Sequence, residues 1–137
     1  MYVKYKIILL LLLATCIGCL SLFNEHKEAN NLKIEPIIFS TISNGTYKGT
    51  YAGGINKWRA NTVVVTVQSG RVIQIKLIHS AELKPNDPRY LELVKRIIDA
   101  QSFNVDVISG ATLTTKAHIK AMEVALKGKN GKNGKNK

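Results

Sequence analysis

The chain has 137 residues, which is enough for one small domain. Its formal net charge of +11 raises the question of nucleic-acid binding. The charge is concentrated at the ends, because Lys4 and Lys6 lie in an apolar leader and five lysines lie from Lys127 onward. Between them only a mild excess remains, without a basic stripe interleaved with aromatic residues, so we expect no nucleic-acid binding. Both cysteines, Cys16 and Cys19, lie in the leader, which excludes a disulfide framework and a thiol-ligated metal site in the folded part.

The leader has the order of a secretory signal, with positive charge, then an apolar run, then small residues. The uncharged run Ile7–Phe23 has 17 residues, at the lower limit for a membrane-spanning helix. Two routes stay open. Residues Ile17–Cys19 resemble a bacterial lipoprotein cleavage box, which would make Cys19 the lipidated first residue, or residues 1–23 stay as an uncleaved anchor. Both routes predict a bacterial protein at the outer, extracytoplasmic face of the cytoplasmic membrane.

After a polar tether over residues 24–40, residues 41–127 carry the pattern of a small domain. Residues 46–51 read as a strand, and residues 62–67 and 72–79 flank a turn that contains Gly70, which predicts a β-hairpin. Each hairpin strand has an apolar face. These faces comprise Val63, Val65 and Val67 on the first strand and Ile73, Ile75 and Leu77 on the second.

Two helices and a further strand are predicted after the hairpin. Asp87 and Pro88 are typical of a helix start. The residues expected to face the sheet are Tyr90, Leu91, Val94, Ile97 and Ile98 from the first helix, and Ile119, Met122, Ala125 and Leu126 from a second helix over about 113–127. Between the helices, Phe103, Val105 and Val107 alternate like a short strand. The order of elements predicts an α+β domain, a small antiparallel sheet with two packed helices.

Residues 128–137 repeat glycine, lysine and asparagine and contain no apolar residue. Such a segment cannot bury a core, so we expect a disordered basic tail. A solubilising role is the simplest interpretation, and attraction to anionic lipid or cell-wall polymer is the functional alternative.

The segment from Ser109 to Thr115 joins the predicted strand to the last helix. Turns of this kind expose backbone N–H groups at a helix N-terminus, where the helix dipole favours an anion. With Thr112 as the N-cap, its hydroxyl would lie beside the free amides of Thr114 and Thr115. A phosphate there would meet those amides and the hydroxyls of Ser109, Thr114 and Thr115, and Lys116 would add positive charge. Helix caps alone explain such residues equally well.

The longer string Asp106, Ser109, Gly110, Ala111 and Thr112 resembles the flavinylation motif of the FMN-binding domain family. This family includes the periplasmic flavinylated domain of the sodium-translocating NADH:quinone oxidoreductase and its counterpart in the related Rnf complex. The similarity extends from about Gly45 to Leu126. It differs at residues 79–87, where members often have a Glu-Thr-Pro-Gly-like stretch near the flavin.

The resemblance implies FMN joined through its phosphate to Thr112. In the family, a flavin transferase makes this bond outside the cytoplasm from FAD with Mg²⁺ and releases AMP. Asp106 matches the acidic residue of the motif, and Ser109, Gly110 and Ala111 match its turn. The implied partners are the flavin transferase, a membrane redox donor, an exported electron acceptor and, through the N-terminus, the membrane.

Two function classes follow. The first is an electron-transfer flavoprotein, and the alternative is a non-redox flavin- or surface-binding lipoprotein module that uses the basic tail. An independent enzyme is the weakest class, because the chain has no nucleophile–base set and no nicotinamide fingerprint. His79 and His118 are isolated, which favours structural or surface roles over metal binding. Trp58 either stacks on the flavin or, more commonly for a lone tryptophan, packs against the sheet.

Overall fold

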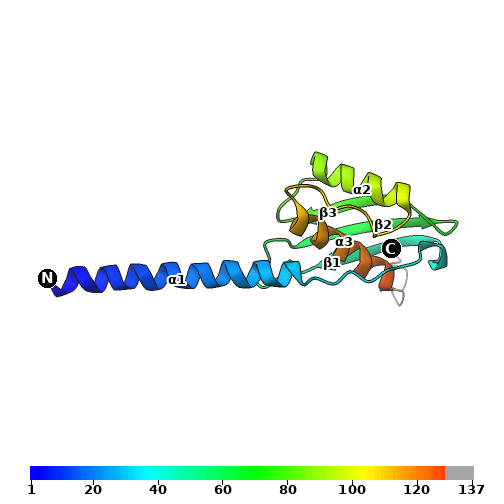
Figure 1. Cartoon of the computed structure of the whole chain (residues 1–137). Coiled ribbons are helices and arrows are strands. Elements are labelled where there is room, and N and C mark those ends of the chain that lie inside the picture. Colours follow the sequence, from blue (N-terminus) through cyan, green and yellow to red (C-terminus); the bar gives the residue numbers. More distant parts are fainter. Residues whose placement is uncertain (129–137) are drawn as a thin grey trace, which may run out of the picture.

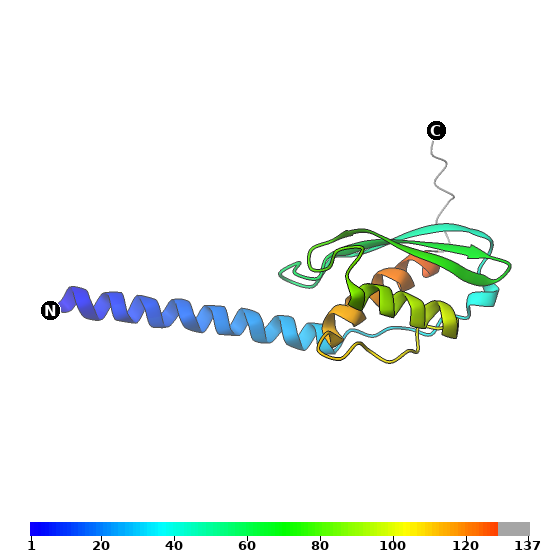
Figure 2. The same ribbon diagram turned by 90° about the horizontal axis from the view of Figure 1, so that it is seen from above.

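A three-stranded antiparallel sheet forms the centre of the domain (Figure 1). The computed structural model describes residues 1–128. Its strands are β1 (Gly45–Tyr51), β2 (Asn61–Gln68) and β3 (Arg71–Ser80), in this order across the sheet. β2 and β3 form the predicted hairpin around Ser69 and Gly70, which both have positive φ. Helices α2 (Pro88–Ala100) and α3 (Thr112–Lys127) cover one face of the sheet (Figure 2). The predicted α+β class is therefore confirmed.

The inward faces of β2 and β3 form much of the core. Val63, Val65 and Val67 are all buried, as the alternation predicted. On β3 the prediction was wrong for Ile73, which is exposed, whereas Val72, Ile75 and Leu77 are buried. The pairing shifts between Thr66, opposite Gln74, and Val67, opposite Val72. Ile73 is therefore the extra residue of a β-bulge, and the bulge places inward positions three residues apart instead of two.

Helix α2 begins as its sequence predicted. Asp87 is the N-cap, its Oδ1 accepts a hydrogen bond from the backbone N–H of Arg89 at 2.9 Å, and Pro88 is the first helical residue. The buried stripe comprises Tyr90, Leu93 and Ile97. Leu91 was predicted to face the sheet but is exposed, because it lies about 100° around the helix from Tyr90. The spacing from Tyr90 to Leu93 and Ile97 is that of one helix face.

Helix α3 lies directly on β1 and β2. Its predicted inward residues Ile119, Met122, Ala125 and Leu126 are all buried. The approach to β1 is closest at Gly49, where an added Cβ would lie 2.0 Å from the carbonyl oxygen of Ala121. Only a residue without a side chain allows the helix backbone to lie this close to the strand.

The prediction of a strand over Phe103–Val107 was wrong, because residues 104–108 are irregular and pair with no strand of the described sheet. The backbone of Val72 on β3 is bound instead by the side chain of Gln101, which accepts from its N–H at 2.8 Å and donates to its carbonyl at 2.9 Å. Phe103 is buried edge-on against Phe39, with ring centroids 4.9 Å apart. The apolar alternation therefore reflects packing of an irregular segment and not membership of the sheet.

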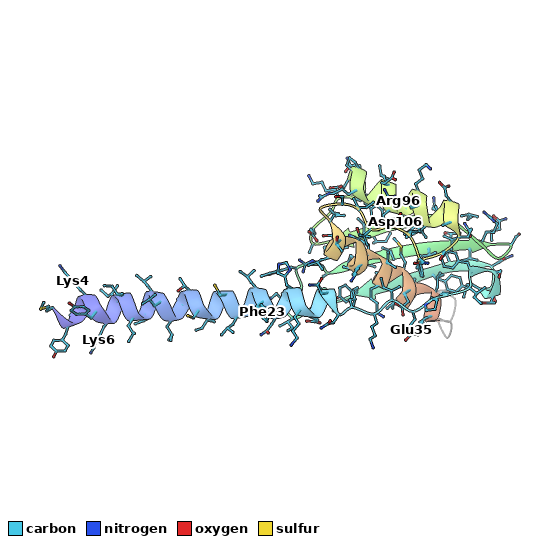
Figure 3. All side chains as sticks on the ribbon, viewed as in Figure 1. Lys4, Lys6, Phe23, Glu35, Arg96 and Asp106 are labelled. Carbon is cyan, nitrogen blue, oxygen red and sulfur yellow. The ribbon has the colours of Figure 1, made fainter. Side chains whose placement is uncertain are left out.

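A single long helix, α1 (Tyr2–Asn30), precedes the domain. Lys4 and Lys6 lie near its free end and Phe23 lies near the domain (Figure 3). The helix continues through residues 24–30, which were predicted to belong to a polar tether, and there Glu25 and Ala29 are buried. This part of the chain is therefore held against the domain.

An extended segment leads from α1 to the short 3₁₀ helix η1 (Phe39–Thr41). Two lysines of α3 bind it: the Nζ of Lys120 donates to the carbonyl of Lys33 at 2.9 Å, and Lys127 pairs with Glu35. These contacts attach residues 31–38 to the outer side of α3. The predicted disordered tail lies outside the described residues, apart from Gly128.

Candidate functional site

A tight turn immediately precedes α3. The backbone N–H of Ala111 donates to the carbonyl of Ile108 at 3.0 Å, and Gly110 between them has φ +73°. Glycine adopts this left-handed conformation without steric cost. An added Cβ on Gly110 would meet no atom within 4 Å, so the turn is open to solvent on this side.

The N-cap of α3 is Ala111, and the prediction of Thr112 at this position was wrong by one residue. The turn ends at Ala111, whose φ of −137° is not helical, and its carbonyl already accepts the N–H of Thr115 at 2.8 Å. Because alanine has no polar side chain, α3 begins without a side-chain cap. By helix geometry, the first amides, those of residues 112–114, have no partner within the helix.

Thr112 is exposed at this start, as are Ser109 and Gly110. Thr112 is therefore accessible from solvent, beside helix-start amides that no side chain caps. Such amides and the positive end of the helix dipole hold phosphate groups well. The residues present thus fit a phosphate carried on or near Thr112. The groups that would hold this phosphate are backbone N–H groups more than side chains.

The other two threonines of the turn are buried and already bonded. Thr114 Oγ1 donates to Glu82 Oε1 at 2.8 Å, and Thr115 Oγ1 accepts from the backbone N–H of Ile108 at 3.4 Å. Their hydroxyls therefore brace the turn internally. Because both hydroxyls are already bonded, a contact of Thr114 and Thr115 with a phosphate stays a prediction only for their backbone N–H groups.

Sequence reasoning did not single out Glu82. It lies between β3 and α2, in the 79–87 stretch that differs from the family pattern, and its carboxylate meets α3 at Thr114. This contact places the 79–87 stretch next to the Ser109–Thr115 turn. In the sequence, Glu82 is marked only as an acidic residue in the loop that precedes α2. This feature is too common to identify a long-range partner.

Asp106 is exposed and precedes the turn. Its backbone carbonyl accepts a hydrogen bond from Nη1 of Arg96 on α2 at 3.0 Å, and both residues are labelled in Figure 3. Arg96 thereby fastens the irregular segment to α2. Asp106 is therefore held through its backbone carbonyl while the residue itself stays exposed.

The turn lies at the end of the domain that faces α1 (Figures 1 and 2). Lys116, in the first turns of α3, donates from Nζ to the carbonyl of Asn30 at 3.2 Å. Asn30 is the last residue of α1. Lys116 therefore connects the start of α3 to the end of α1. Its amine, which was expected to add positive charge beside a phosphate, is bonded to α1 instead.

Two polar side chains are buried beneath the site without hydrogen-bond partners. The hydroxyl of Tyr90 and Nδ1 of His118 are both unpaired among the described residues, and the two rings stack edge to face with centroids 5.3 Å apart. Burial raises the pKa of Tyr90, and it lowers the pKa of His118 to about 4 against a smaller opposing effect of Asp87. His118 is therefore neutral in the folded protein at neutral pH, and its buried ring packs against Tyr90.

This burial predicts acid sensitivity. His118 has a lower pKa folded (about 4) than unfolded (6.5), so the unfolded chain binds more protons between these values and stability falls as the pH drops. From pH 7 to pH 5 the folded state should lose about 2 kcal/mol through this residue. Urea unfolding at both pH values should show this loss in the wild type and its absence in His118→Leu. His79→Gln, on exposed β3 surface, is the control and should retain the wild-type loss. An equal loss in His118→Leu would contradict the assignment.

Comparison with protein families identifies the domain. The model of the FMN-binding domain matches residues 56–127, which are more than half of the chain. The match includes β2, β3, both packed helices and the whole Ser109–Thr115 turn. No curated protein matches the chain significantly. The chain therefore belongs to the FMN-binding domain family, and it is a flavin-binding protein.

Proposed function

We propose that this protein is a membrane-anchored, extracytoplasmic electron-transfer flavoprotein that carries FMN in phosphoester linkage to Thr112. The observation that carries the proposal is an exposed threonine at an uncapped helix start, in a chain of the FMN-binding domain family. Thr112 is also the threonine that matches the flavinylation motif, and among the three threonines of the turn it is the exposed one.

The linkage requires a transferase and a balanced exchange. The oxygen of Thr112 takes the place of AMP on the flavin-bearing phosphorus of FAD, so one P–O bond forms, one breaks and the hydroxyl proton is released. The helix-start amides would hold the phosphate, and Asp106 is exposed for recognition by the transferase. FMN bound in this way supplies one- or two-electron transfer. A covalent link prevents loss of the cofactor by dilution outside the cell.

The anchor would be α1. Among residues 1–128, it is the helix long and apolar enough to cross a membrane, and a signal sequence has the same character. Lys4 and Lys6 precede the apolar run, which favours a cytoplasmic N-terminus and an outer domain. Asn30 lies about 10 Å along the helix beyond Phe23, so the Lys116–Asn30 contact supports a flavin site close to the membrane surface and to a membrane redox donor. An exported carrier would accept the electrons.

Cys16 and Cys19 are both exposed on α1. Within the described part of the chain, the side-chain hydrogen bonds from α1 to the domain come from residue 21 onward. A chain shortened to Cys19 by lipoprotein processing would therefore keep these contacts. Lipidation of Cys19 and retention of the whole helix are both compatible with the proposed anchoring.

The full chain co-expressed with a flavin transferase tests the proposal. The expected product is yellow, keeps flavin fluorescence on a denaturing gel, and has the intact mass of one added FMN minus water. Reduction and air reoxidation of the bound flavin should then be reversible. Flavin that washes out during denaturation would contradict the covalent link and favour the non-redox binding module. The same mass spectrum distinguishes a lipidated Cys19 from an intact N-terminus.

A further inference from the structure

We propose that the loop between β1 and β2, residues 52–60, is a second membrane contact, with Ile55 and Trp58 seated in the headgroup layer beside α1. This β1–β2 loop lies at the end of the sheet that faces α1 (Figure 2). The inference rests on the proposed insertion of α1 into a membrane and is independent of the flavin. Its occupant is the lipid of the same bilayer.

Hydrogen bonds and an ion pair attach the β1–β2 loop to α1. Glu25 on α1 is only 2% exposed, and its carboxylate accepts from the backbone N–H of Asn56 at 3.1 Å and from Nη1 of Arg59 at 3.4 Å. One turn further along α1, Glu28 accepts from the backbone N–H of Ile55 at 3.2 Å. A buried carboxylate that is paired in this way is costly to separate from its partners. The loop and the helix therefore keep a defined relative position.

The β1–β2 loop reaches the apolar part of α1. The side-chain Nδ2 of Asn56 donates to Oγ of Ser21 at 3.2 Å. Ser21 lies within the uncharged run Ile7–Phe23, about 3 Å before its end. If this run occupies the hydrocarbon layer, the tip of the loop lies at the boundary between hydrocarbon and headgroups. Membrane insertion of α1 thus brings the loop to the interface without any rearrangement.

The exposed side chains of the β1–β2 loop suit a membrane interface. Ile55 is 67% exposed, Trp58 is 47% exposed, and Lys57 between them is exposed. Trp58 does not belong to the buried core, in contrast to the expected packing against the sheet. Tryptophan is enriched at membrane interfaces because its ring is apolar and its N–H is polar. Lysine beside it is attracted to lipid phosphates.

The surroundings of Ile55 support the same partner. An open hollow next to it is lined by three lysines, Lys27, Lys33 and Lys120, and by one carboxylate, Glu28. Lys120 is paired with Glu123 at 2.9 Å, so Lys27 and Lys33 against Glu28 leave a small excess of positive charge. At the level of the membrane surface, this excess complements phospholipid headgroups. A neutral or acidic hollow would have argued against a lipid partner.

Trp58 is the only tryptophan of the chain, so its fluorescence reports directly on the loop. The full chain is produced without flavin transferase, to avoid energy transfer to FMN, and is reconstituted into phosphatidylcholine vesicles with or without lipids brominated near the headgroup. Zwitterionic lipid minimises attraction of the basic tail. The control is Trp58→Phe combined with Ile38→Trp, because Ile38 is 69% exposed next to the β2–β3 turn, at the opposite end of the sheet.

We expect brominated lipid to quench Trp58 at least about twofold and leave the control emission unchanged, because only interfacial tryptophan contacts the lipid. Aqueous iodide should quench the control more strongly than Trp58. Equal accessibility of the two tryptophans to iodide, in chains that float with the vesicles, would overturn the loop contact and leave α1 as the anchor. Failure to float would overturn both. Neither result bears on FMN linkage, which Trp58→Phe should retain when the transferase is present.

Discussion

Replacement of Thr112 by valine should abolish covalent flavin completely and leave the fold intact. Valine has nearly the same shape as threonine but no hydroxyl, so no phosphoester can form at this position. Because Thr112 is exposed and its side chain does not cap α3, the stability should change by no more than about 0.5 kcal/mol. The measurement is in-gel flavin fluorescence of the variant co-expressed with the transferase, beside its circular dichroism and urea unfolding. Thr112→Ser, which keeps a hydroxyl, should retain the link.

Thr114→Val is the matched control, since Thr114 lies two residues further along the same helix and carries the same functional group. It should keep full in-gel fluorescence. The variant loses the hydrogen bond to Glu82, which costs about 1 kcal/mol of stability. Fluorescence that survives in Thr112→Val and disappears in Thr114→Val would move the attachment point to Thr114. Loss in both variants would show that the transferase needs the intact turn and not Thr112 alone.

Replacement of Gly49 by alanine should destabilise the domain severely, by about 3 kcal/mol or more, the upper range for overpacking of a well-packed interior. The added Cβ would lie 2.0 Å from the carbonyl oxygen of Ala121 and 2.4 Å from the backbone N of Ala125. Both neighbours are backbone atoms of α3, so no side-chain rotation can relieve the clash. Separation of α3 from β1 would expose core residues. Urea unfolding in mild detergent, followed by far-UV circular dichroism, measures the loss.

Gly110→Ala provides the comparison for a glycine with open space around it. No atom lies within 4 Å of an added Cβ there, and only the positive φ of +73° is unfavourable, which costs about 1–2 kcal/mol. We expect Gly49→Ala to be clearly the more damaging of the two changes. If its unfolding midpoint equals that of the wild type, α3 does not pack on the backbone of β1 as the structure has it.

Local patterns predicted those elements that depend on neighbours in the sequence. The β2–β3 hairpin follows from apolar alternation around a glycine turn, and the start of α2 follows from Asp87 and Pro88. The inward face of α3 follows from helical spacing. The turn before α3 follows from serine, glycine and threonine ahead of a helix, and its use as a phosphate site stays a prediction.

The same patterns failed where the outcome depends on distant residues. Phe103, Val105 and Val107 alternate like a strand, but Gln101 binds the backbone of Val72 at the edge of β3, and Phe103 packs on Phe39. Ile73 has the period of an inward residue, but the bulge opposite Thr66 and Val67 turns it outward. Pairing and register are properties of two strands at once, so one strand's composition does not decide them.

For this protein, the sequence by itself determined the α+β class, the apolar leader and the turn that carries Thr112, because each depends on periodicity or on residues close in the chain. Only the tertiary structure decided that Ala111 occupies the N-cap position of α3, that Glu82 binds Thr114, and that Glu25 holds the β1–β2 loop against α1. The Glu82 and Glu25 contacts join residues about thirty positions apart. The physical reason is that a carboxylate has no preferred partner in the unfolded chain. The fold decides which donors it meets, at the surface for Glu82 and out of water for Glu25.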